Sequence, residues 1–150
     1  DTLIADLAEM RLALQPAAAA MAARRASAEE IVELYEIAGR LDNPAHTRES
    51  IAKVDLEFHL AVARVSRNPF MRSISALIEA ALAASFQLSS PASSTEKIAE
   101  CAGNHLRIVR AIAARDEAAA RLAMENVIHV GVDRTMTALH ADMPLTNAQA

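Results

Sequence analysis

The sequence is poor in the residues that build sheets. Aromatic residues make up only 3% of its 150 residues, with no tryptophan, three glycines and five prolines. Because strands are enriched in aromatic and β-branched residues, this shortage argues against a sheet. The hydrophobic share is nevertheless 53%, and alanine dominates it. Since alanine, leucine, glutamate, arginine and methionine are the best helix formers, the composition predicts an all-α fold with small side chains at close-packed helix seams.

Cysteine is almost absent as well. Cys101 stands alone, which excludes an internal disulfide framework and favours a reducing compartment. No apolar run reaches the length of a membrane span, and no signal peptide is visible. The first residue is Asp1, and the helical pattern begins almost at once. We therefore expect a fragment of a larger cytoplasmic protein that does not enter a membrane.

An excess of positive charge is also missing. The chain has 15 Lys and Arg against 19 Asp and Glu, a formal net charge of −4. A domain that grips the nucleic-acid backbone normally presents a basic face, so direct binding of nucleic acid by this segment is not expected. The sequence also lacks a glycine-rich phosphate loop, a nucleophile elbow and a metalloprotease helix motif. We therefore expect that the chain is not an enzyme.

Apolar residues recur at helical spacing in six segments, separated by breaks rich in proline, asparagine or serine. The predicted helices cover residues 2–25, 27–41, 47–66, 69–88, 95–115 and 117–139. Pro16 should kink the first helix, because proline removes a backbone hydrogen bond. The pattern predicts one domain over residues 1–142, an antiparallel bundle of about six helices. Residues 143–150 are expected to form a flexible tail.

Asp55 and His59 lie four residues apart in a strongly apolar helical pattern, so they share one helix face. That face is marked as buried by Ile51, Val54, Phe58, Val62 and Val65. A buried, unpaired carboxylate is costly, so Asp55 needs a cation, a metal or several hydrogen-bond donors. His105 lies at the centre of another apolar stripe. Because Asp and His are ordinary ligands of zinc and similar ions, these three residues form a candidate metal site.

Other interpretations of these residues remain open. A buried histidine is more often a hydrogen-bonded core residue than a ligand, and Asp55 could simply pair with Arg11. Arg11 itself falls between Leu7 and Leu14 in the apolar seam. Its stem could pack while its head reaches water, or its guanidinium could hold a carboxylate in a cavity. The histidines expected outside any site are His46, His129 and His140.

Five short motifs follow one another along most of the chain. Residues 9–18 read E-M-R-L-A-L-Q-P-A-A, close to E-x-R-x-x-L-E-P-x-A, and residues 55–59 match D-x-x-F-H. Residues 66–69 resemble S-x-N-P, residues 105–112 match H-x-x-I-x-x-A-I, and residues 116–124 resemble D-x-x-x-A-x-x-A-M. In this order the motifs resemble the FadR C-terminal (FCD) effector domain of GntR-family bacterial transcription regulators.

This resemblance implies a bundle with a central ligand cavity that binds a small organic acid. In many members one Asp and three His hold a divalent metal there, such as zinc, nickel or manganese. Asp55, His59 and His105 match the Asp and two of the His, and Arg11 matches an arginine near the effector's carboxylate. Val127 stands where the family has its last metal-binding His. The resemblance therefore implies either three protein ligands, completed by water or effector, or a metal-free domain.

The resemblance also implies partners. A winged helix-turn-helix normally precedes this domain and binds DNA as a dimer, and no such segment is present in this sequence. DNA binding is thus expected only through that absent domain. The leading hypothesis is an effector-sensing and dimerisation domain that binds a small carboxylate and acts by population shift. The alternatives are a metal-dependent helical-bundle enzyme and a ligand-free helical dimerisation module.

Overall fold

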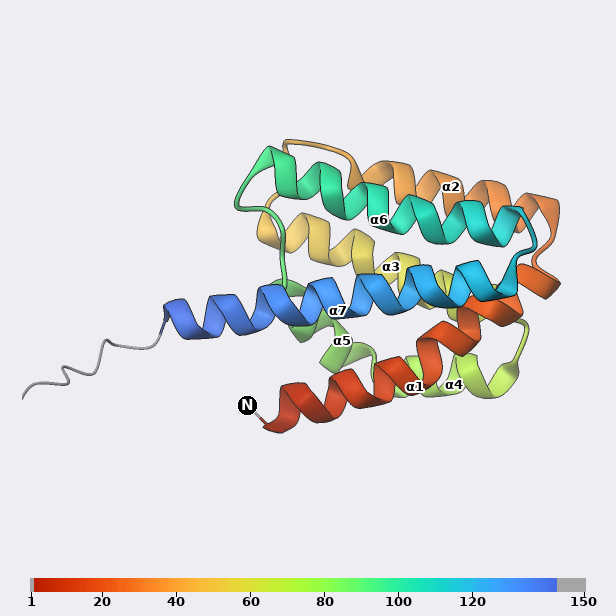
Figure 1. Ribbon diagram of the computed structural model, residues 1–150, viewed down its shortest axis with the longest axis horizontal. Coiled ribbons are helices and arrows are strands. Elements are labelled where there is room, and N and C mark those ends of the chain that lie inside the picture. Colours follow the sequence, from red (N-terminus) through yellow and green to blue (C-terminus); the bar gives the residue numbers. More distant parts are fainter. Residues whose placement is uncertain (1, 143–150) are drawn as a thin grey trace, which may run out of the picture.

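The computed structural model describes residues 2–142, which form seven helices and no strand (Figure 1). The helices are α1 (Thr2–Arg25), α2 (Ala28–Leu41), α3 (Arg48–Val65), α4 (Pro69–Leu77), α5 (Glu79–Leu88), α6 (Thr95–Ala113) and α7 (Glu117–Ala141). The prediction of an all-α bundle is confirmed. The predicted flexible tail, residues 143–150, lies outside the described residues. None of the seven helices combines the length and the hydropathy that a membrane span requires.

Polar caps determine where the helices begin. At the start of α2 the Ser27 hydroxyl accepts a hydrogen bond from the backbone N–H of Glu30, whose carboxylate accepts one from the N–H of Ser27. This reciprocal capping box satisfies two donors that the first turn leaves free. Thr47 and Ser50 make the same pair of bonds at the start of α3. Both helices therefore begin directly after the residue whose side chain caps the first turn.

Replacing Ser27 by alanine should lower the stability of the domain. The substitution removes the hydroxyl that caps α2, and loss of such a cap costs about 1 kcal/mol. For a domain of this size we expect the Tm to fall by about 2–4 °C. Thermal unfolding followed by circular dichroism measures this shift. An equal fall for Ser73→Ala, which alters an exposed serine, would show that the cap has no special role.

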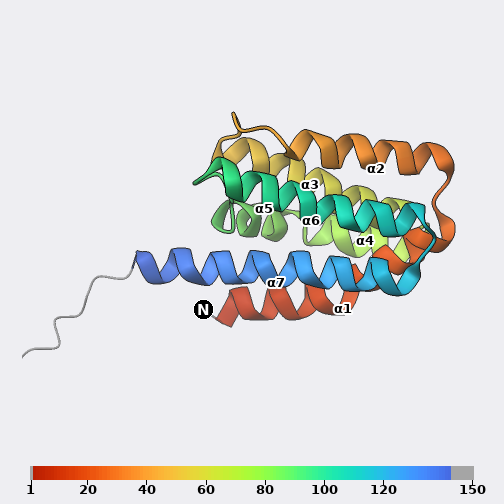
Figure 2. The same cartoon turned by 45° about the horizontal axis from the view of Figure 1, so that its top comes forward.

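α1 is built for close packing. Alanines at positions 18, 19, 22 and 23 are buried, and small side chains let a neighbouring helix approach closely. α1 and α7 run side by side and antiparallel (Figure 1, Figure 2). Pro16 lies inside α1, which changes direction partway along its length (Figure 1), as its proline predicted.

The helix predicted over residues 69–88 is divided into α4 and α5. The division lies at Ile78, whose backbone angles (φ −97°, ψ 6°) leave the helical region. α5 then turns Leu82 and Phe86 into the core, whereas no residue of α4 is buried. A straight helix would keep its apolar residues on one stripe, but the break lets α4 lie outside the core as a cover.

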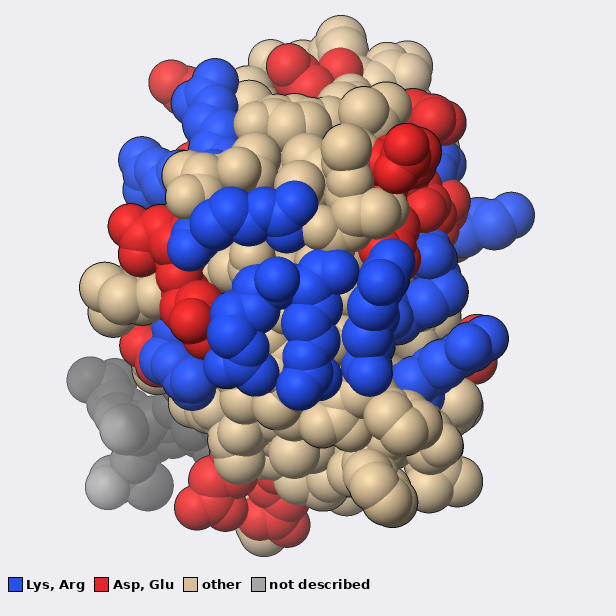
Figure 3. Space-filling model, turned by 90° about the vertical axis from the view of Figure 1, so that its right-hand side faces the viewer, with Lys and Arg blue, Asp and Glu red and all other residues tan. Residues whose placement is uncertain are grey.

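Arginines gather at one end of the bundle, the end that faces the viewer in Figure 3. The last turns of α1, α3 and α6 carry Arg24, Arg25, Arg64 and Arg110. A cation near a helix C-terminus interacts favourably with the helix dipole. Arg25 also donates to the carbonyl of Ser66, and Arg115 donates to the carbonyl of Ala26. The concentration of arginines at this end therefore has a structural explanation, because Arg25 and Arg115 join the ends of neighbouring helices.

Candidate functional site

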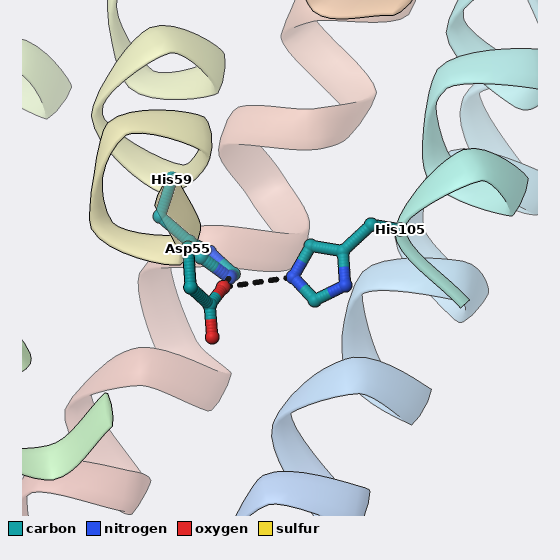
Figure 4. Close-up of side chains that lie close together, drawn as sticks. All are labelled: Asp55, His59 and His105. Atoms are coloured by element: carbon teal, nitrogen blue, oxygen red, sulfur yellow. Dashed lines mark hydrogen bonds and ion pairs between the residues drawn. The ribbon is translucent and has the colours of Figure 1, made fainter. Parts of the chain in front are cut away.

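Asp55, His59 and His105 meet inside the bundle (Figure 4). Asp55 and His59 lie one turn apart on α3, and His105 reaches them from α6. One ligand-type atom from each residue lies within 4.8 Å of the others. Their exposed fractions are 8%, 4% and 1%. The structure thus brings together the three residues that the sequence singled out as a candidate metal site.

His105 has a defined proton arrangement. Its Nδ1 lies 2.8 Å from the carbonyl oxygen of Cys101, which can only accept, so Nδ1 carries a proton. Its Nε2 lies 2.8 Å from Oδ1 of Asp55, drawn as the dashed line in Figure 4. Because a carboxylate oxygen also accepts, Nε2 must either carry a second proton or share a cation with Asp55. Burial disfavours the charged imidazole, but the Asp55 carboxylate outweighs it and raises the pKa of His105 to about 10.

Asp55 is the acceptor at the centre of the cluster. Burial alone would favour its neutral form. The charge of His105 and its hydrogen bond to Asp55, together with the nearby imidazole of His59, instead hold the pKa of Asp55 well below its usual range. Asp55 is therefore a carboxylate near pH 7, which is the form that binds metal.

The ring nitrogens of His59 have fewer hydrogen-bond partners than those of His105. Its Nε2 lies 3.1 Å from the same Oδ1 of Asp55, but the contact is not aligned as a hydrogen bond, and neither ring nitrogen has another partner within residues 2–142. Burial lowers the pKa of His59 to about 4, against the opposing effect of Asp55. The imidazole is therefore neutral near pH 7 and offers a lone pair. Buried polar atoms without hydrogen-bond partners are rare in folded proteins, so the unpaired ring nitrogens of His59 need an explanation.

A divalent metal fits this donor set. One carboxylate oxygen and two imidazole nitrogens are ordinary ligands of zinc and related ions. A metal among them would satisfy the Nε2 lone pairs of His59 and His105. The bond from His105 to Cys101 is of the kind that metal-binding histidines make through their other nitrogen. The sequence did not point to this role of the Cys101 carbonyl, although its position four residues before His105 could have indicated it.

α7 contributes no ligand to the cluster. Val127 is buried and has no metal-binding atom. His129 is exposed, as predicted, and α7 remains α-helical around it, so no π-bulge turns it inward. His46 lies apart in the α2–α3 connection, where it contacts Ser50 and the carbonyl of Arg40. His140 is exposed near the end of α7. Among residues 2–142, any metal here would therefore find three protein ligands.

Arg11 is buried on α1, with 4% of its surface exposed, so its head does not reach water. Its Nε donates a hydrogen bond to Oε1 of Gln15 at 3.1 Å, and its guanidinium carbon lies 4.9 Å from the ring centre of Phe86. No ion pair joins Arg11 to Asp55 in the described part of the chain. Burial lowers the pKa of Arg11 to about 10, partly opposed by Asp55. Arg11 is therefore a buried cation at neutral pH.

A narrow cavity lies between Arg11, His59 and α4. Its walls are formed by Arg11, Leu14, Gln15, Ala18, His59, Val62, Ala63, Met71, Ile74, Ser75, Ile78 and Met124. Its volume is about 10 Å³, which is room for about one water molecule. α4 supplies the outer wall through Met71, Ile74 and Ser75. A ligand larger than a water molecule would fit here only if this wall moved outward.

Comparison with known proteins identifies a domain family and a solved structure that this chain is similar to. The FCD domain model matches residues 6–130. Among solved structures, Streptococcus agalactiae GntR superposes with a TM-score of 0.70 at 27% sequence identity, over 89% of this chain and 58% of that chain. The chain thus spans less than two thirds of that protein. A search of the curated proteins found no match.

Proposed function

Because this chain belongs to the FCD domain family, we propose that it senses a small carboxylate for a GntR-type transcription regulator, with a divalent metal beside the ligand. One observation carries the proposal. The unpaired nitrogens of buried His59 and the buried cation of Arg11 line the same cavity. Such polar groups converging on an otherwise apolar pocket are typical of a ligand site.

Asp55, His59 and His105 would hold the metal. Its chemistry would be electrostatic, because a bound divalent ion attracts a carboxylate oxygen into a dry cavity. With Val127 in place of a fourth ligand, a coordination position remains for water or for the effector. The Arg11 guanidinium would bind the same carboxylate group by charge-assisted hydrogen bonds.

Binding would require movement of α4. Since no residue of α4 is buried, moving this helix would release few side chains of its own from the core, although Met71 packs against the core. A ligand that binds the opened form better than the closed one shifts the population toward it. Arg11 lies on α1, the first helix of the chain, so the ligand acts directly on the element nearest to any preceding DNA-binding domain. Dimerisation would then let two such domains change their spacing together.

The proposal is tested by thermal unfolding of the tag-free protein with zinc, nickel or manganese, each alone and with citrate, malate, lactate or benzoate. A ligand at 100 times its Kd should add about 2.7 kcal/mol of stability, or about 5–10 °C in Tm. We expect the largest rise with metal and acid together. If no acid raises the Tm with or without metal, the chain is better described as a ligand-free dimerisation module.

A further inference from the structure

We propose that the guanidinium groups of Arg64, Arg67 and Arg72 form a second binding site, which takes the phosphate group of a small molecule and thereby joins α4 to α3. The three arginines surround a surface hollow between these helices, whose other walls are Asn68 and Pro69. The site itself is independent of the carboxylate cavity. Only its consequence, that a bound phosphate opposes entry of a carboxylate, rests on the proposed function.

The sequence brings the three arginines together through a short turn. Residues 66–69 read S-R-N-P and carry the chain from α3 into α4. Asn68 caps α4, because its side-chain oxygen accepts hydrogen bonds from two backbone N–H groups of the first turn. Arg64 stands just before this turn, Arg67 within it and Arg72 just after it. All three side chains therefore reach one hollow.

Arg72 has an unfavourable position for a cation. It is the fourth residue of α4, and the start of a helix carries the positive end of the helix dipole. Its side chain is exposed and makes no hydrogen bond or ion pair within residues 2–142. The dipole thus does not explain this arginine, as it does those at the C-terminal ends of other helices (Figure 3). An anion beside Arg72 would instead be stabilised by both the dipole and the guanidinium.

The other two arginines keep donors free for such an anion. Arg64 pairs with Glu33, and Arg67 pairs with Glu30. Each pair uses one guanidinium nitrogen, and a guanidinium has five N–H donors. Among residues 2–142, no acidic side chain lines the hollow itself. Its walls therefore carry positive charge that has no compensating anion inside the hollow.

Acidic side chains border Arg72 on its other side. There a neighbouring hollow is lined by Arg64, Arg72, Glu33, Glu57 and Glu79, among others. The carboxylates of Glu33 and Glu57 are already bound by arginines. No ion pair joins Arg72 to Glu79 in the part of the chain that the structure describes. An anion would therefore bind on the side of Arg67, where no carboxylate competes.

A phosphate group fits three arginines better than a carboxylate does. A phosphate monoester presents three acceptor oxygens and carries a charge of about −1.5 to −2 at pH 7, whereas a carboxylate has two oxygens and a single charge. The planar fork of arginine binds phosphate by paired, charge-assisted hydrogen bonds. The hollow has a volume of about 230 Å³, which leaves room for a short organic body beside the phosphate.

A phosphate in this site would hold α4 in its closed position. Arg72 belongs to α4 and Arg64 to α3, so one phosphate bound to both joins the two helices. Met71, the neighbour of Arg72, forms part of the outer wall of the carboxylate cavity. A carboxylate requires this wall to move outward, whereas the phosphate favours the inward position. Two ligands that favour opposite states weaken each other's binding by the same factor.

Calorimetric titration with inorganic phosphate and with glycerol 3-phosphate tests the site, at about 0.15 M NaCl, where distant surface charges are largely screened. We expect the Kd for both compounds to rise at least tenfold in Arg72→Gln. Arg72→Lys should recover only part of the affinity, because an ammonium lacks the planar fork. Arg110→Gln removes an exposed charge at the end of α6 and should change neither Kd more than twofold.

Three results would overturn the site. The first is that neither compound binds, and the second is equal affinity in Arg72→Gln and the unaltered protein. The third comes from a short DNA duplex titrated in parallel. If only the duplex binds, and does so through Arg72, the phosphates that the arginines recognise belong to a nucleic-acid backbone and not to a small molecule.

Hydrogen exchange measures the effect on α4 without any carboxylate. No residue of α4 is buried, so its backbone amides should exchange through local opening. Saturating glycerol 3-phosphate should slow exchange of the α4 amides at least threefold in the unaltered protein and leave it unchanged in Arg72→Gln. The amides of α6 are the internal reference. Unchanged exchange of α4 in the phosphate-bound, unaltered protein would show that the anion does not join the helices.

Failure of this inference is distinguishable from failure of the proposed function. With glycerol 3-phosphate present, the Kd of the acid that stabilises the protein most should rise at least fivefold, but not in Arg72→Gln. If phosphate binds through Arg72 and this Kd is unchanged, the opposition between the two ligands is wrong. If no acid binds at all, the proposed function fails, and the titrations and the exchange of α4 still decide the phosphate site.

Discussion

Replacing His59 by alanine should abolish binding of a divalent metal to this domain, and replacing His105 should do the same. Each substitution leaves only two of the three ligands that α3 and α6 bring together. Even residues behind the ligands contribute about 10- to 100-fold to metal affinity, so we expect a loss of at least about 100-fold. Elemental analysis of protein prepared without a His-tag or chelator, followed by calorimetric titration with zinc, measures it. The unaltered domain should hold roughly one equivalent.

His129→Ala is the matched control, because His129 is exposed on α7 and lies outside the cluster. It should retain the metal content of the unaltered protein. If the unaltered protein takes up no metal even after its addition, the cluster is an ion pair of Asp55 with protonated His105. Loss of metal from His129→Ala would point to a site elsewhere on the surface.

The second large effect is expected at Arg11. Arg11→Ala should weaken binding of the carboxylate by about 2–5 kcal/mol, the cost of truncating one partner of a buried, charge-assisted pair. This corresponds to a factor of about 30 or more in Kd. Arg11→Lys should recover only part of the affinity, because an ammonium keeps the charge but lacks the planar fork. Calorimetry with the acid that stabilises the protein most measures both effects.

Arg121→Ala removes a cation from an exposed position of α7 and should leave the affinity for the acid unchanged. Circular dichroism establishes whether each variant is folded before binding is compared. Affinity of Arg11→Ala equal to that of the unaltered protein would remove Arg11 from the site. An equal loss in Arg121→Ala would show that general electrostatics, and not a local contact, governs binding.

Much of the candidate site could be predicted from the sequence. Asp55 and His59 are four residues apart in a helical pattern, and this spacing alone places them on one face. The apolar residues around them mark that face as buried. His105 could be assigned to a buried stripe in the same way, and the capping box at Ser27 and Glu30 followed from residue types and spacing. The FCD motifs, carried by most of the chain, linked these residues to one kind of site.

Other features could not be obtained in this way. The Nε2 of His105 meets Asp55 across 50 residues of sequence, and no periodicity states which two stripes face each other. The contact of Phe86 with Arg11 depends on the break at Ile78, where the sequence predicted an uninterrupted helix. Phe70 and Leu77 have apolar side chains, yet they are 78% and 83% exposed because α4 lies outside the core.

The sequence by itself determined most of the helices, their buried faces and the placement on one face of residues one turn apart, such as Asp55 and His59. These follow from backbone geometry, which repeats every 3.6 residues whatever surrounds the helix. Only the tertiary structure decided that His59 lacks an aligned hydrogen bond, that Arg11 has no ion pair with Asp55, and that α4 closes the cavity to about 10 Å³. The physical reason is that contacts between distant segments depend on how all the side chains of the core pack at once.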